Sequence, residues 1–160
     1  MIEKALLERN ELIRFWKESF NFTQAELRAF MEVKREDFIP LELKEAAYAD
    51  MPLPLMRGKT ISQPTTVMLM THLLELNKGN KVFEVGTGSG YQAAIISKIV
   101  GPKTKVITTE VVPELIHFSK NNFNKANIKN VVVLEDDGSN GMPSEAPFDR
   151  IIITAACKEF

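Results

Sequence analysis

Hydrophobic positions in the first part of the chain follow a helical period. Between residues 3 and 20 the apolar side chains recur at intervals of three, four or seven residues, which places them on one face of a helix. Thr23 followed by Glu26 has the pattern of a capping box, in which each residue bonds to the backbone of the other. The pattern predicts a second helix that runs through Phe30 to about Val33.

After residue 64 the pattern changes to helices that alternate with short apolar runs. The runs "KVFEV", "KVITT", "NVVVL" and "RIIIT" are nearly continuous, which is typical of strands buried on both faces of a parallel sheet. We predict strands at 81–85, 105–109, 131–134 and 150–154, and helices at 65–76, 91–100 and 113–126. This order predicts a Rossmann-like, doubly wound α/β fold with a mainly parallel sheet and helices on both faces.

The organisation is therefore an N-terminal helical segment followed by an α/β core. We place helices and a substrate-side loop in residues 1–64 and the core in residues 65–160, as parts of one structural domain. Between them, residues 40–64 hold four prolines and one glycine, and predict a long, shaped connection with one short helical turn. Residues 51–64, with Gly58 as a flexible point, fit a mobile lid and a rigid loop equally well.

Composition narrows the classes of protein that fit this pattern. The 160 residues include 20 Lys and Arg against 21 Asp and Glu, a balance that argues against nucleic-acid binding through phosphate neutralisation. The single cysteine, Cys157, excludes an internal disulfide, and the charged, amphipathic start is typical neither of a signal peptide nor of a membrane span. We expect a cytoplasmic protein without nucleic-acid or membrane partners.

The candidate chemistry begins with the glycine loop in "VFEVGTGSGY". Its spacing is G-x-G-x-G over Gly86, Gly88 and Gly90, whereas a dinucleotide fingerprint needs G-x-G-x-x-G. An acid, Glu84, also lies two positions before the first glycine. The loop therefore predicts a nucleotide-like cofactor other than a nicotinamide dinucleotide.

Acidic residues follow the next two strands. Glu110 comes twenty residues after Gly90, where a carboxylate usually binds ribose hydroxyls; the alternative is a solvated charge at the strand end. After the third strand, "LEDDGSNG" offers carboxylates for an adenine amine, or forms only a polar turn. His72 and His117 lie on separate predicted helices without a partner at i+4, so we expect no metal site.

The stretches "GKTISQPTTVMLM", "VFEVGTGSGYQAA", "DDG" and "DRIIITAA" resemble the protein-L-isoaspartate O-methyltransferase family. The resemblance begins near "VKREDF" and covers most of the chain, and "TISQP" is its most specific part. It implies methyl transfer from S-adenosylmethionine to the free α-carboxylate of L-isoaspartyl residues in damaged proteins and peptides. A peptide α-carboxyl ionises near pH 3.5, so such a reaction needs no general base.

The resemblance also assigns roles to individual residues. Ser62 matches the active-site serine, which we interpret as a hydrogen-bond donor to the substrate carboxylate. The other substrate-side residues are Thr60, Gln63 and Thr154. The residues that match the cofactor site are Glu84, Gly86, Thr87, Gly88, Glu110, Asp137 and Gly138. The chain departs from the family where glycine or glutamine is frequent, at Arg57, Lys59 and Asp136.

The family normally continues for roughly fifty residues after "CKEF", enough for two or three strands and a helix. We therefore expect the C-terminal strands of the fold to be absent, strand 151–153 to present an exposed edge, and this edge to favour self-association. Three alternatives stay open: an inactive cofactor-binding fragment of such an enzyme, another S-adenosylmethionine-dependent methyltransferase and, least favoured, a nicotinamide dehydrogenase.

Overall fold

A four-stranded parallel sheet forms the centre of the protein in the computed structural model, which describes residues 2–156. Its strands lie in the order β5-β4-β3-β6, and each neighbouring pair is parallel. The strands are β3 (Val82–Val85), β4 (Val106–Glu110), β5 (Val131–Glu135) and β6 (Arg150–Ile153). The predicted strands are thus confirmed to within one residue at each end, because continuous apolar runs mark strands that are covered on both faces.

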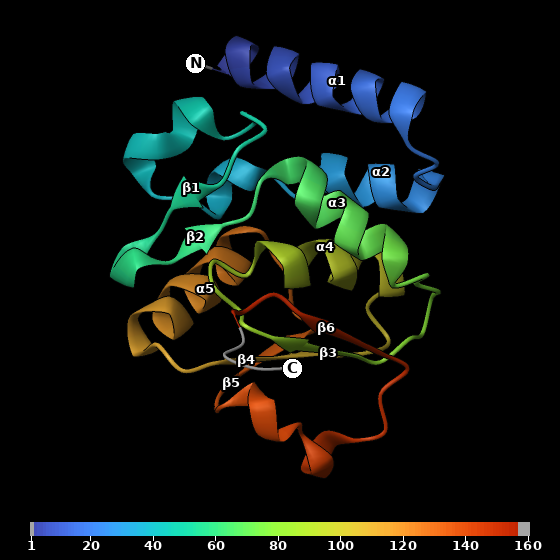
Figure 1. Cartoon of the computed structure of the whole chain (residues 1–160), viewed down its shortest axis with the longest axis vertical. Coiled ribbons are helices and arrows are strands. Elements are labelled where there is room, and N and C mark those ends of the chain that lie inside the picture. Colours follow the sequence, from blue (N-terminus) through green and yellow to red (C-terminus); the bar gives the residue numbers. More distant parts are fainter. Residues whose placement is uncertain (1, 157–160) are drawn as a thin grey trace.

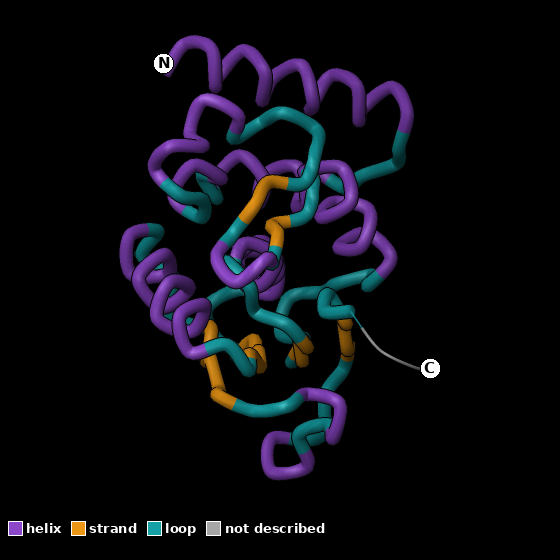
Figure 2. The backbone as a smooth tube through the Cα atoms, turned by 60° about the vertical axis from the view of Figure 1, so that its left-hand side comes forward, coloured by secondary structure: helices purple, strands orange, loops and turns teal. Residues whose placement is uncertain are grey.

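The two crossover helices cover one face of this sheet. α4 (Tyr91–Val100) joins β3 to β4, and α5 (Pro113–Lys125) joins β4 to β5, so both lie on the same side (Figure 1). Seen nearly along the sheet, the long helices lie above the strands and the segment from β5 to β6 lies below them (Figure 2). That segment contains two 3-10 turns, η4 (Gly138–Asn140) and η5 (Pro143–Glu145). This reversal between β5 and β6 makes the sheet doubly wound.

The N-terminal helices extend the core on the helical face. α1 (Ile2–Ser19), α2 (Gln24–Glu32) and α3 (Pro64–Leu73) share one cluster of buried side chains with α4 and the sheet. Trp16 is fully buried, with its ring centroid 4.6 Å from that of Phe30. The capping box at Thr23 and Glu26 is confirmed, with both reciprocal bonds present. The division at residue 64 stays a prediction.

A β-hairpin occupies the proline-rich connection, where the sequence predicted a loop. β1 (Leu53–Pro54) pairs with β2 (Thr60–Ile61), and the 3-10 turn η3 (Met56–Gly58) joins them. Two further 3-10 turns, η1 (Arg35–Asp37) and η2 (Leu41–Ala46), precede this hairpin. Two-residue strands show no hydrophobic period, and Pro54 fits because it lies in an edge strand of a two-stranded ribbon. The hairpin lies beside the start of α5 (Figure 1).

β6 is an edge strand within the described residues. It pairs with β3 alone there, and Ile151 and Ile153 are 57% and 47% exposed, whereas Ile152 points into the core. Such an edge can pair with another chain, and self-association through it stays a prediction. Across residues 2–156, no helix is both long and apolar enough to cross a membrane.

Candidate active site

The glycine loop turns sharply between β3 and α4 and is held against β4. The backbone N–H groups of Gly86 and Thr87 both donate to the carbonyl of Thr109, at 2.9 and 3.0 Å. Gly86 has φ 99°, and a Cβ on it would lie 2.9 Å from Ala155. Gly90 has φ 87°, and a Cβ there would lie 2.5 Å from the Phe123 ring of α5. Both glycines are therefore required by positive φ and by close packing.

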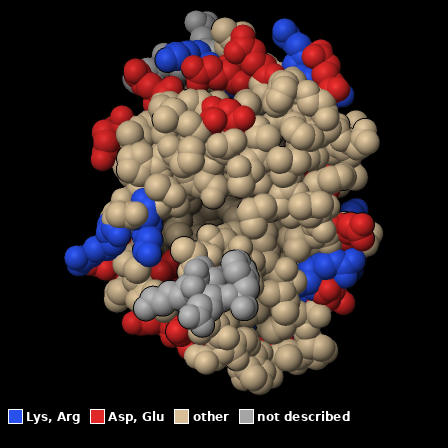
Figure 3. Space-filling view, viewed as in Figure 1, with Lys and Arg blue, Asp and Glu red and all other residues tan. Residues whose placement is uncertain are grey.

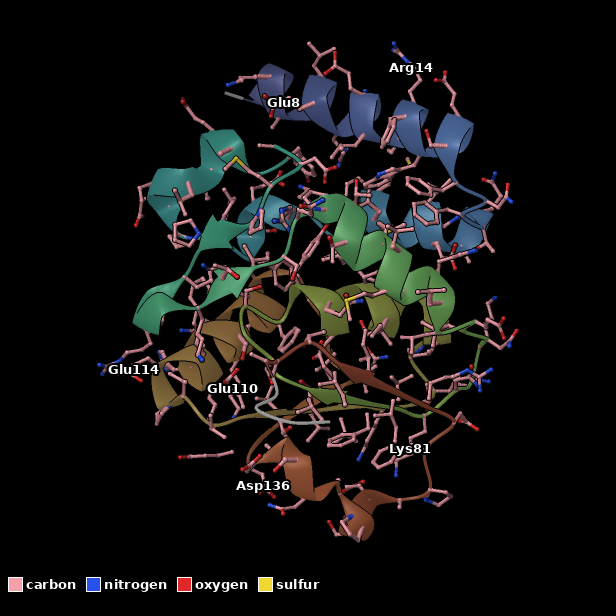
Figure 4. All side chains as sticks on the ribbon, viewed as in Figure 1. Glu8, Arg14, Lys81, Glu110, Glu114 and Asp136 are labelled. Atoms are coloured by element: carbon pink, nitrogen blue, oxygen red, sulfur yellow. The ribbon has the colours of Figure 1, made fainter. Side chains whose placement is uncertain are left out.

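Glu110 ends β4 and binds the glycine loop. One carboxylate oxygen accepts from the N–H of Gly88 at 2.9 Å, and the other accepts from the N–H groups of Val111 and Val112, both at 3.0 Å. The residue is only 8% exposed. It lies at the same end of the sheet as Asp136, opposite Lys81 (Figure 4). A carboxylate has about four acceptor positions, so Glu110 retains capacity for a ligand hydroxyl.

Glu84 is buried beneath the loop in a chain of hydroxyl groups. Thr108 donates to its Oε2 at 2.6 Å, and the Thr87 hydroxyl lies 2.7 Å from that of Thr108. Its other oxygen, Oε1, is buried and has no partner among the described residues. Burial, with a smaller contribution from the charge of Glu110, raises the pKa of Glu84 to about 8, although the bond from Thr108 opposes the shift. Its carboxyl therefore holds a proton at neutral pH.

Two further predicted residues lie against the loop. The Thr154 hydroxyl donates to the carbonyls of Gly86 and Val85, at 2.6 and 3.1 Å, so its hydrogen bonds go to the cofactor side. Gly138 packs so closely that a Cβ would lie 2.5 Å from the Thr109 hydroxyl. The neighbouring Asp137 is exposed and caps η4 by accepting from the N–H of Ser139 at 3.0 Å, which lowers the pKa of Asp137.

Ser62 follows β2 directly and is half-buried. Its carbonyl accepts from Nη2 of Arg35 at 2.7 Å. In the described part of the chain its hydroxyl makes no hydrogen bond, so it is free to donate to a ligand. Thr60 is exposed in the hairpin, and Gln63 occupies the N-cap position of α3 without a capping bond from its side chain. Neither residue bonds to the glycine loop in the described structure.

The first turn of α3, immediately after this segment, is held by a chain of hydrogen bonds that runs from exposed Asp50 to buried Trp16. The carboxylate of Asp50 accepts from the N–H and the hydroxyl of Thr65, at 2.9 and 2.6 Å. Trp16 Nε1 in turn donates to the Thr65 hydroxyl at 2.8 Å. The Ser62 segment is therefore held at two points, by Arg35 at the Ser62 carbonyl and by Asp50 at Thr65, three residues after Ser62.

The tip of the hairpin is attached to α5. Arg57 forms an ion pair with Glu114, and Figure 4 shows Glu114 on the side of the molecule where the hairpin meets α5. An open, mainly apolar groove of about 510 Å³ lies between Met56 of the hairpin and His117 and Phe118 of α5. The space-filling view shows a hollow near the centre of the molecule, with basic side chains to its left and others towards the right edge (Figure 3).

Comparison with known proteins identifies the family of this chain. The profile described as protein-L-isoaspartate(D-aspartate) O-methyltransferase matches residues 7–160. The chain belongs to this family. It is 48% identical over 132 residues to the protein-L-isoaspartate O-methyltransferase of Methanopyrus kandleri, and 45% identical over 152 residues to that of Ignicoccus hospitalis.

Solved structures of the methyltransferase family share the fold. A protein-L-isoaspartate O-methyltransferase, 31% identical, superposes on 94% of this chain with a TM-score of 0.82. A Plasmodium falciparum protein solved with S-adenosyl-L-homocysteine, 24% identical, superposes on 96% with a TM-score of 0.81.

This chain is shorter than the methyltransferases that it matches. The match to the Methanopyrus kandleri protein spans 82% of this chain and 58% of that protein. The match to the Ignicoccus hospitalis protein spans 94% of this chain and 72% of that protein. It covers 49% of the first solved enzyme and 75% of the Plasmodium falciparum protein.

The structure also shows what Arg57 and Asp136 do at positions where the family often has glycine. Arg57 adopts φ 58° and ψ 31°, a left-handed conformation that favours glycine, and its side chain supplies the ion pair to α5. Asp136 accepts from the N–H of Asp137 at 2.8 Å, which fixes the turn before η4.

Three residues of the site were missed by sequence reasoning: Arg35, Tyr91 and Thr108. A polar Thr108 inside a buried run was a usable signal, because such a side chain needs a partner. The burial of Arg35 and the contact of Tyr91 with it had no sequence signal. Among residues 2–156, no group of three or more His, Cys, Asp or Glu side chains is placed to bind a metal.

Proposed function

We propose that this chain transfers a methyl group from S-adenosylmethionine to the α-carboxylate of L-isoaspartyl residues in proteins and peptides. The observation that carries the proposal is the bond between Gly88 and Glu110, because it joins a close-approach loop to an acid suited to ribose hydroxyls at the switch point of the sheet. Family membership supports the same reaction.

The residues present fit the cofactor in three respects. Glu110 offers acceptor positions at the end of β4, and Gly86 and Gly88 leave the loop without side chains. Glu84 has a buried oxygen without a partner in the described structure, which leaves one position for a polar group of the cofactor. Asp137 and Gly138 lie at the end of β5, where we place the adenine. When bound, the cofactor supplies a methyl group on a positively charged sulfur.

On the substrate side, positioning is the main task of the protein. The substrate carboxylate is ionised at neutral pH, so its oxygen attacks without a base. The free hydroxyl of Ser62 donates to one carboxylate oxygen and leaves the other to react, with Thr60 and Gln63 on either side. The hairpin, whose tip is joined to α5 by Arg57 and Glu114, is the segment suited to limit access of water, which would otherwise stabilise the separate charges. The lone cysteine agrees with the cytoplasmic location we expect.

The test compares an isoaspartyl peptide with its aspartyl twin, using methyl transfer by mass spectrometry and calorimetry with S-adenosylhomocysteine. We expect cofactor binding and methylation of the isoaspartyl peptide alone. Binding without turnover would identify a cofactor-binding module, which is relevant because the chain spans 58% of its Methanopyrus kandleri relative. Equal methylation of both peptides, or no cofactor binding, would contradict the proposal.

A further inference from the structure

Arg35 is a fully buried cation beside Ser62. It is 0% exposed, although arginine is almost never fully buried unless it is paired. No carboxylate lies within ion-pair distance of it in the described residues, and burial lowers the pKa of its guanidinium. A buried cation without an ion-pair partner is costly, so its position calls for a reason other than stability.

The contacts of Arg35 join the two halves of the site. Its Nη2 donates to the carbonyl of Ser62 at 2.7 Å. The same guanidinium stacks on the ring of Tyr91, with 5.0 Å between its central carbon and the ring centroid. Tyr91 is the first residue of α4 and follows Gly90 directly. One rigid, planar group therefore contacts both the Ser62 segment and the helix that begins at the glycine loop.

The backbone of Arg35 is also held, by a bond to Tyr48. Its backbone N–H donates to the Tyr48 hydroxyl at 3.3 Å, and this hydroxyl donates to Glu36 at 2.7 Å. Two guanidinium nitrogens, Nε and Nη1, have no hydrogen-bond partner in the described structure. The side chain thus makes few bonds of its own, and the bond to Ser62 is its main polar contact.

We propose that Arg35 is a positioning residue that couples binding of the substrate carboxylate at Ser62 to binding of the cofactor at the glycine loop. The inference rests on the proposed function. Movement of α4 on cofactor binding passes through the Tyr91 ring to the guanidinium, and from there to the Ser62 carbonyl. The charge of Arg35 also favours a carboxylate near Ser62. Lysine cannot replace it fully, because an ammonium lacks the planar fork and the stacking face.

The main test measures the affinity for an isoaspartyl peptide with and without S-adenosylhomocysteine. In the wild type we expect the cofactor product to raise peptide affinity severalfold. In Arg35→Met we expect peptide affinity to fall about tenfold or more, the enhancement to disappear, and affinity for S-adenosylhomocysteine alone to stay within about twofold. Arg35→Lys should restore part of the peptide affinity. Arg28→Met, which removes an exposed cation of α2, is the matched control and should behave as wild type.

A ligand-free measurement separates this inference from the proposed function. Hydrogen exchange over residues 60–65 should be faster in Arg35→Met than in Arg28→Met, because the Ser62 carbonyl has lost its donor. If both Arg35 variants fail to fold, variants of Tyr91 provide the test. Tyr91→Phe should keep the coupling, because the Tyr91 hydroxyl has no hydrogen-bond partner in the described structure. Tyr91→Leu should lose the coupling, because it removes the ring on which Arg35 stacks.

Two results would overturn the inference. The first is a wild type that binds both ligands without coupling. The second is an Arg35→Met protein with unchanged coupling and unchanged exchange at 60–65. A wild type that fails to bind S-adenosylhomocysteine, or that does not distinguish the isoaspartyl peptide from its aspartyl twin, contradicts the proposed function instead, and the exchange measurement still tests the contact of Arg35.

Discussion

Replacing Glu110 with alanine removes one carboxylate that accepts from three backbone N–H groups. Each charge-assisted bond contributes about 1.5–3 kcal/mol to the free energy of unfolding. The three contributions cannot simply be added, because bonds to one group are not additive. Val111 is 60% exposed, so water can replace the lost acceptor there. The bond to half-buried Gly88 dominates, and we expect a loss of about 2–3 kcal/mol in the free energy of unfolding.

Thermal unfolding and calorimetry with S-adenosylhomocysteine measure the two consequences of this change. For a domain of this size, each kcal/mol lowers Tm by about 2–4 °C, so Glu110→Ala should lower Tm by about 4–12 °C. The affinity of Glu110→Ala for S-adenosylhomocysteine should also fall by more than the loss of folded protein accounts for, because the ribose hydroxyls lose their acceptor. Glu110→Gln keeps one acceptor oxygen and should be intermediate in both measurements.

Glu135 provides the matched control for Glu110. It is the residue paired with Glu110 on β5, ends its strand at the same edge of the sheet, and is exposed. Glu135→Ala should leave Tm and cofactor affinity nearly unchanged. If Glu110→Ala is indistinguishable from Glu135→Ala in both measurements, Glu110 is only a surface charge and the reasoning from Gly88 is wrong.

Three further changes test other parts of the site. Ser62→Ala should lower methylation of the isoaspartyl peptide about 10- to 100-fold through loss of one charge-assisted bond of about 1.5–3 kcal/mol, while calorimetry finds cofactor affinity unchanged; an equal loss of both would contradict its role. Because burial raises the pKa of Glu84 from 4.5 to about 8, the native protein keeps a proton that the unfolded chain releases. The resulting stability is complete below about pH 4.5 and is lost as pH rises to 8, so denaturant unfolding should show wild type losing up to about 5 kcal/mol relative to Glu84→Gln across that interval; parallel curves would refute this. Arg57→Gly relieves a left-handed backbone but removes the ion pair to Glu114, so Tm should change little while hydrogen exchange over residues 53–61 becomes faster, and unchanged exchange would mean that the pair does not hold the hairpin.

The sheet and the glycine loop could be predicted because their signals are local. A buried strand shows as a continuous apolar run, and Gly86 and Gly90 mark the turns where a side chain would collide with Ala155 or Phe123. The position of Glu110 after β4 followed from the same alternation. Its bond to Gly88 did not, because a hydrogen bond between two strand ends depends on register and side-chain rotamer.

The substrate side was harder to predict for a physical reason. The hairpin has two residues in each strand, too few for a period of two, and its prolines indicate a loop. The bond between Arg35 and Ser62 spans 27 residues and depends on how η1 and the hairpin pack on α4. The resemblance named Ser62, but neither resemblance nor periodicity indicated the buried cation bonded to its carbonyl.

The charges of the site are separated in a way that suits the proposed reaction. Glu110 places a negative charge at the end of β4, while Glu84, with its raised pKa, stays neutral at pH 7 and adds no second charge. Arg35 places a positive charge behind Ser62. A substrate carboxylate is therefore repelled from the strand ends by Glu110 and attracted towards the Ser62 hydroxyl, whereas a cationic sulfonium is favoured beside Glu110. Each reactant is therefore attracted to its own side of the site by the opposite charge, which favours the orientation that the proposed methyl transfer needs.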